Sequence, residues 1–101
     1  MWEKIKTYLI YYLFGKYCIA KYKEIPIQLN KFTIYIIEDW SILLKCPCGC
    51  TNDVQLNTLE GCAPSWSYEI HKNNISISPS VKRNKGCRSH FWIKKGKILW
   101  V

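Results

Sequence analysis

Five residues that could bind a metal ion fall into two short clusters. The first cluster is Cys46-Pro47-Cys48-Gly49-Cys50, and the second is Cys87-Arg88-Ser89-His90. Thiolates at about 2.3 Å and an imidazole at about 2.0 Å form the usual coordination shell of zinc. The chain between the clusters is long enough to form several strands that bring them together. The sequence therefore predicts one zinc site.

The first cluster needs a bend in the backbone to place its thiols on one ion. Residues at alternate positions of an extended strand point to the same side, and Pro47 and Gly49 are suited to bend it. Zinc takes about four ligands, whereas the clusters offer five. We favour Cys46, Cys48, Cys87 and His90, with Cys50 as the substitute. Four protein ligands would make a structural site, and three with a water molecule a catalytic one.

A catalytic zinc also needs a group that orients or deprotonates the water. The acids near the clusters are Asp53, Glu60 and Glu69, each more commonly a solvated surface carboxylate. Glu60 lies in a loop from which it could reach the metal. Ser89 lies inside the second cluster, where a hydroxyl caps a turn or contacts the site or a substrate. Glu60 and Ser89 are therefore the candidate catalytic residues.

The composition is that of a small globular protein. The chain has 101 residues, of which 49% are apolar, and a formal net charge of +8. That charge would suit an acidic partner such as nucleic acid. Lysine, however, greatly outnumbers arginine and is spread along the chain, so we attribute the charge to a general abundance of lysine rather than to a nucleic-acid-binding surface. Neither a signal peptide nor a membrane-spanning segment is evident. Clustered thiols then indicate metal binding in the reducing cytoplasm rather than a disulfide framework.

The hydrophobic pattern predicts a mainly β fold of the α+β class. Residues 2–14 have helical periodicity and end at Gly15, and we expect this helix to pack on the sheet through Trp2, Ile5, Leu9, Tyr12 and Leu13 rather than to bind a membrane surface or partner. From residue 25 the pattern is that of strands. They are expected at 32–37, 40–44, 53–59, 65–70, 75–78 (ended by Pro79), 90–93 and 97–100. The sequence thus predicts a helical extension at 1–24 and a zinc-binding antiparallel β domain at 25–101.

An ordered set of motifs from about residue 25 to the C-terminus resembles a known family. The motifs are Cys46-Pro47-Cys48-Gly49-Cys50, Leu56-Asn57, Pro64-Ser65-Trp66, Ser76-Ile77-Ser78-Pro79-Ser80, Gly86-Cys87-Arg88-Ser89-His90-Phe91-Trp92-Ile93 and Gly96-Lys97-Ile98-Leu99-Trp100. They are similar to BubE, a family of small bacterial proteins found beside ubiquitin-like conjugation genes. This chain differs from the family pattern directly before Pro64. A basic residue is expected at that position, and this chain has Ala63.

The resemblance implies a zinc-dependent peptidase that trims or releases a ubiquitin-like protein or its conjugates. The metal candidates would be Cys46, Cys48, Cys50, Cys87 and His90, and Ser89 would be a site residue. The metal would polarise the scissile carbonyl and activate a water molecule.

The alternative hypothesis is a non-catalytic module with a structural zinc. Its basic, aromatic surface would bind nucleic acid or a protein partner, with tryptophan rings stacking on bases and lysines contacting phosphates.

Overall fold

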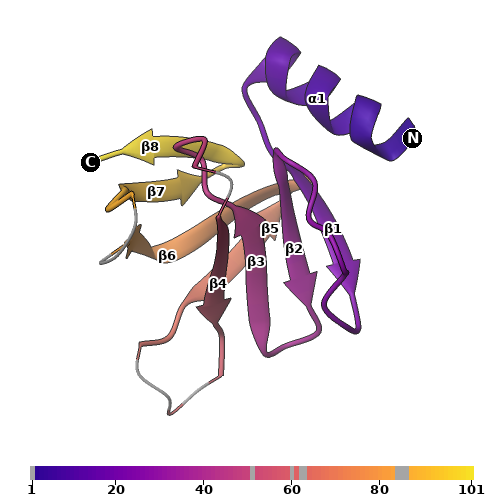
Figure 1. The fold of residues 1–101 in the computed structure, drawn as a ribbon. Coiled ribbons are helices and arrows are strands. Elements are labelled where there is room, and N and C mark those ends of the chain that lie inside the picture. Colours follow the sequence, from indigo (N-terminus) through magenta and orange to yellow (C-terminus); the bar gives the residue numbers. More distant parts are fainter. Residues whose placement is uncertain (1, 51, 60, 62–63, 84–86) are drawn as a thin grey trace.

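A helix and two four-stranded β-sheets make up the domain (Figure 1). This computed structural model describes residues 2–50, 52–59, 61, 64–83 and 87–101. The elements are α1 (Trp2–Phe14), β1 (Cys18–Tyr22), β2 (Thr33–Ile37), β3 (Ser41–Lys45), β4 (Asp53–Asn57), β5 (Ser67–His71), β6 (Asn74–Lys82), β7 (His90–Lys94) and β8 (Lys97–Trp100). The predicted class, a small and mostly β domain with an N-terminal helix, is confirmed.

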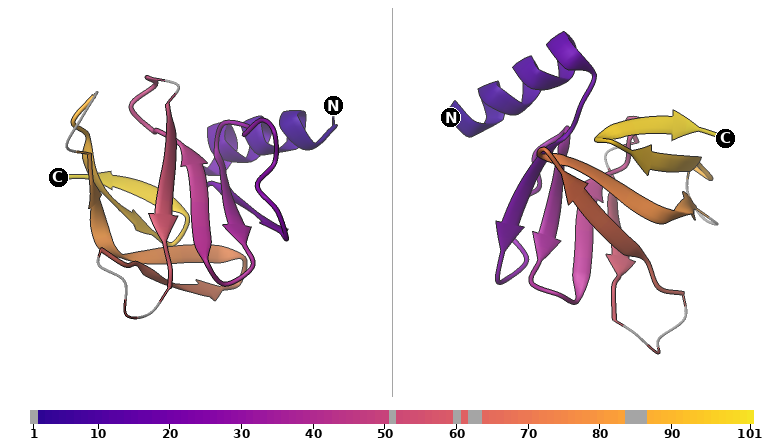
Figure 2. Two further views of the ribbon diagram at one scale, coloured as in Figure 1. Left: turned by 60° about the horizontal axis from the view of Figure 1, so that its bottom comes forward. Right: turned by 180° about the vertical axis from the view of Figure 1, so that it is seen from behind.

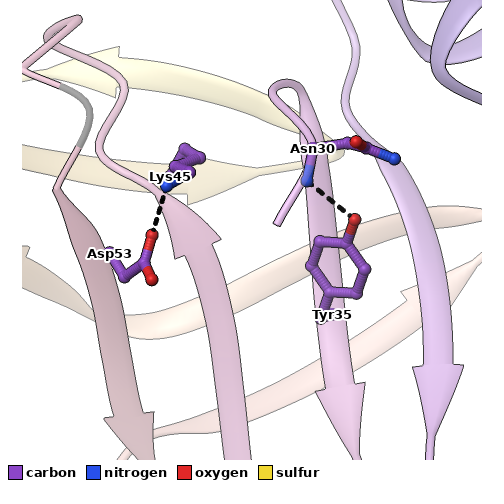
Figure 3. A network of polar contacts seen from close by, with 4 residues as sticks. All are labelled: Asn30, Tyr35, Lys45 and Asp53. Carbon is purple, nitrogen blue, oxygen red and sulfur yellow. Dashed lines mark hydrogen bonds and ion pairs between the residues drawn. The ribbon is translucent and has the colours of Figure 1, made fainter. Parts of the chain in front are cut away.

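The first sheet has the strand order β1-β2-β3-β4. Strands β1 and β2 are parallel, whereas the other neighbours are antiparallel. All five residues of β2 are buried, in keeping with its run of β-branched and aromatic side chains. The β3–β4 hairpin pairs Lys45 with Asp53, and their side chains form an ion pair of 2.7 Å (Figure 3). This pair lies at the end of the hairpin, directly before Cys46.

The second sheet, β5-β6-β7-β8, is antiparallel throughout. Its register shifts between β6 and β7. Ile77 pairs with Ile93 and Val81 pairs with Phe91, so four steps along β6 match two along β7. The extra length is a bulge at Ser78, Pro79 and Ser80, and bulges of this kind redirect side chains.

The core lies between the two sheets, which face each other in both views of Figure 2. Its fully buried members alternate along their strands, as the period of two requires. They include Ile34, Ile42 and Leu44 of the first sheet and Ile75, Ile77, Phe91 and Ile93 of the second. A smaller cluster of Leu29, Tyr35, Ile37 and Leu43 covers the other face of β2. There the Tyr35 hydroxyl accepts a hydrogen bond of 2.9 Å from the backbone N–H of Asn30 (Figure 3).

The helix ends at Phe14 and is followed by Gly15, as predicted. Gly15 has a φ of 68°, and its N–H donates to the carbonyl of Tyr11. The predicted packing stripe is wrong for the side chains described, because Ile5, Leu9, Tyr12 and Leu13 are exposed. The helix instead contacts the domain through aromatic rings, with Tyr11 stacked on Phe32 at 3.9 Å. No described helix is long and apolar enough to cross a membrane.

Two strands differ from the sequence-based prediction. Strand β1 was not expected, and its partner in the sheet is the parallel strand β2. Strand β6 does not end at Pro79 but continues to Lys82. Proline lacks the N–H needed for a regular ladder and is tolerated at a bulge, which is where Pro79 lies.

Candidate active site and cysteine cluster

Four cysteines from two distant segments meet at one end of the domain. The Sγ atoms of Cys46, Cys48, Cys50 and Cys87 all lie within 4.8 Å of one another. The Sγ of Cys46 is 3.3 Å from that of Cys48 and 3.4 Å from that of Cys87. Four thiolates around a tetrahedral ion at about 2.3 Å would be separated by roughly 3.8 Å. The four cysteines could therefore hold a metal ion.

The turn after β3 gathers three of these thiols. Gly49 has a φ of 90°, which favours glycine, and its N–H donates to the carbonyl of Cys46. The N–H of Cys46 donates to the carbonyl of Asn52, which closes the turn. The N–H of Cys50 points to the Sγ of Cys48 at 3.4 Å. Pro47 and Gly49 thus lie in a tight turn of the kind that the spacing predicted.

The thiols of the cluster differ in how readily they ionise. The Ser89 hydroxyl, 3.0 Å from the Sγ of Cys87, is the main reason that the pKa of Cys87 falls to about 6. The pKa of Cys48 is also lowered, chiefly through the Ser89 side chain. Burial raises the pKa of Cys46 to about 12. Cys46 therefore retains its proton in the metal-free protein at neutral pH, whereas Cys87 is mostly a thiolate.

Positive charge lies beside the cluster. A hollow of about 170 Å³ is lined by Cys46 and Cys48 together with Lys31 and Lys45. Four thiolates around a divalent cation carry a net charge of −2, which Lys31 would partly offset, whereas the charge of Lys45 is already paired with Asp53. The surroundings therefore suit a multiply ionised thiolate cluster better than an apolar wall would.

A second pair of reactive side chains lies on β6 and β7. The Oγ of Ser80 is 2.9 Å from the Nε2 of His90, and both residues are half-buried. The β6 bulge carries Ser80, and the indole N–H of Trp66 donates to the Ser80 carbonyl at 3.4 Å. With Nδ1 protonated, Nε2 can accept the serine proton, which is the arrangement of an activated nucleophile. Among the residues that the structure describes, no carboxylate is hydrogen-bonded to His90.

Similarity to a known protein family covers most of the chain. The family model described as "Bacterial ubiquitination-like system serine protease (BubE)" matches residues 21–101. The chain belongs to the BubE family. Neither a curated protein nor a solved structure matches at a significant level. The family description names a serine protease, whereas the sequence led us to expect a zinc-dependent peptidase.

Within this BubE family member, the predicted site residues separate into two groups. The cluster contains Cys50 as well as the favoured Cys46, Cys48 and Cys87. His90 is not in the group of four, and its Nε2 contacts Ser80. Ser89 is buried and contacts Cys87, with Cys46 at 3.8 Å. Glu60 lies outside the described residues.

Sequence reasoning missed Ser80 as a site residue. In the sequence Ser80 stands out only as the last residue of the motif Ser76-Ile77-Ser78-Pro79-Ser80. The available signal was the recurrence of serine in that motif together with a histidine in a later one. Serine and histidine ten residues apart become a pair only when β6 and β7 adopt their register.

Proposed function

We propose that this protein is a serine protease that cleaves a ubiquitin-like protein or its conjugates, with Ser80 as nucleophile and His90 as general base. The observation that carries the proposal is the 2.9 Å contact between Ser80 Oγ and His90 Nε2. The family supports a protease of a bacterial ubiquitination-like system. Clustered thiols further favour the reducing cytoplasm as its location.

The chemistry follows from the two side chains. Ser80 Oγ attacks the scissile carbonyl carbon while its proton passes to Nε2 of His90. The C–N bond then breaks, and the imidazolium gives that proton to the leaving amine. The acyl group remains on Ser80 as an ester. Water attacks the ester as His90 takes its proton, and transfer of this proton to Ser80 Oγ restores the enzyme and releases the carboxylic acid product.

The metal in this proposal is a structural zinc ion held by Cys46, Cys48, Cys50 and Cys87. Four thiolates complete the shell of zinc, so the ion supplies folding stability rather than a bound water. The turn that contains Cys87 leads within three residues to His90. Binding of the metal would therefore fix the segment that delivers the histidine.

The test is cleavage of a bacterial ubiquitin-like protein extended at its C-terminus by a reporter protein. Ser80→Ala and His90→Ala are expected to lower the cleavage rate by a factor of roughly 10³ or more, because each removes one half of the pair. Both variants should retain the metal content of the unmodified protein, measured by atomic emission. Ser65→Ala, at an exposed serine, is the matched control.

A different result would redirect the proposal. Full activity in Ser80→Ala, with cleavage lost only when the metal is lost, would support catalysis at the cysteines instead.

A further inference from the structure

A groove lies on the outer face of the second sheet, on the side that carries the Ser80–His90 pair. Its volume is about 420 Å³, and its lining includes Trp92 and Ser78. Trp92 is two residues from His90 on β7, and Ser78 is two residues from Ser80 on β6. Residues two apart on a regular strand share a face, as His90 and Trp92 do on β7. On β6 the bulge interrupts this alternation between Ser78 and Ser80. The groove therefore begins beside the reactive pair.

The floor and walls of the groove differ in chemistry. Ser76 and Ser78 on β6 lie between Glu69 on β5 and Trp92 on β7. Small serine side chains leave room for a backbone and offer hydroxyls to it. The ammonium of Lys94 lies 4.6 Å from the centre of the Trp92 ring, along the β7 wall. The groove thus has a polar floor, a β7 wall formed by Trp92 and the ammonium of Lys94, and a β5 wall that carries Glu69.

Glu69 is unusual on this surface. The chain has 15 lysines and arginines but only seven acids, and the ion pair recorded among the described residues joins Lys45 to Asp53 instead. A second hollow of about 490 Å³ shares Glu69 and Ser76 and is lined further on by Lys72 and Lys95. Among the described residues that line the two hollows, Glu69 is the one acid, with Lys94 in the first hollow and Lys72 and Lys95 in the second.

We propose that this groove binds the extended substrate chain next to the scissile bond and that Glu69 selects a basic substrate side chain. The inference rests on the proposed serine protease function and names its specificity residue. Glu69 pairs with Ser76, four residues before Ser80. The bulge shortens this span, because the four steps from Ile77 to Val81 advance only about two residues along the sheet. At about 3.3 Å per residue, Ser76 then lies roughly 8 Å from Ser80, which places the preferred lysine or arginine about two or three residues from the cleaved bond.

The experiment uses internally quenched ten-residue peptides of Gly, Ala and Ser in which one Lys or one Glu is moved through each position. The unmodified protein should cleave the peptide with Lys at the second or third position from the bond about threefold faster, in kcat/KM, than the peptide with Glu there. Glu69→Gln should remove this preference, and Glu69→Lys should reverse it. The change should appear in KM, with kcat retained. Glu24→Gln, at an exposed acid beyond β1, is the matched control.

A fluorophosphonate, which modifies activated serines, separates failure of this inference from failure of the proposed function. If Ser80 is labelled but Glu69→Lys keeps the lysine preference, the assignment of Glu69 is overturned. If Ser80 is labelled and no peptide is cleaved, the groove does not bind peptide and the inference also fails. If Ser80 is not labelled, the protease proposal fails, and the inference fails with it.

Discussion

The segment from Cys87 to His90 connects two sites of opposite character. Cys87 faces the thiols of the β3–β4 turn, whereas His90 faces Ser80 on the bulged strand β6. The first site gathers four ligands of one kind and has a buried member in Cys46. The second pairs an acid–base group with a nucleophile and is half-open to solvent. In the proposed function, this short segment therefore contributes Cys87 to a structural metal site and His90 to a separate catalytic site.

Ser89 illustrates how the two sites are kept apart. It is adjacent to His90, yet its hydroxyl is buried and lies against Cys87. Alternation along the chain sends neighbouring side chains to opposite faces, so Ser89 points to the cysteines and His90 points to the outer face. Ser89, the serine closest in sequence to His90, thus contacts the cysteines, whereas Ser80 contacts the histidine.

Removal of a cluster thiol should have the largest effect on stability. Cys46→Ser should abolish stoichiometric zinc binding and lower the melting temperature by at least about 10 °C, because structural zinc contributes several kcal/mol and each kcal/mol shifts the melting temperature of a small domain by about 4–8 °C. Calorimetry and metal analysis measure both. Ser80→Ala should melt within about 2 °C of the unmodified protein, and Cys18→Ala, on β1, should keep its metal. An equal loss of stability in Ser80→Ala would remove the distinction between the sites.

Zinc affinity should rise with pH, because thiols must lose their protons to bind the metal. The pKa of Cys87 is about 6, so this thiol is already ionised above that pH. The pKa of Cys46 is about 12, so its proton is still present between pH 7 and 9 and must be displaced. Affinity is expected to increase at least about tenfold per pH unit in that range, measured by competition with a chromogenic chelator. A flat profile would show that Cys46 is not a ligand.

Loss of the indole hydrogen bond to Ser80 should have the smallest effect of the three. Trp66→Phe removes the N–H that donates to the Ser80 carbonyl, a contact of about 1 kcal/mol. The nucleophile would then be less well positioned, and kcat should fall about threefold to tenfold with unchanged metal content. Trp40→Phe, before β3, is the control. A loss of metal in Trp66→Phe would mean that the bulge and the cysteine cluster are coupled.

The sequence predicted local features more fully than long-range ones. The helix end at Gly15, the alternating strands and the Pro47–Gly49 bend all depend on neighbouring residues, and each is present. Strand β1 pairs in parallel with β2, which follows a connecting segment. The hydrophobic pattern of that segment does not indicate which strand β1 will pair with. The contact between Ser80 and His90 depends on a two-residue offset between β6 and β7. That offset is set by how Ile77 and Val81 pack in the core, which a single sequence does not display.

The central claim is that hydrolysis occurs at Ser80 with His90 and that the cysteine cluster holds a structural metal. The most direct measurement is to treat the zinc-loaded protein with a fluorophosphonate and to locate the adduct by peptide mass spectrometry. We predict one adduct, on Ser80, which is lost in His90→Ala while the zinc remains bound. An adduct on Ser89, or no adduct in a preparation that cleaves its substrate, would contradict the account.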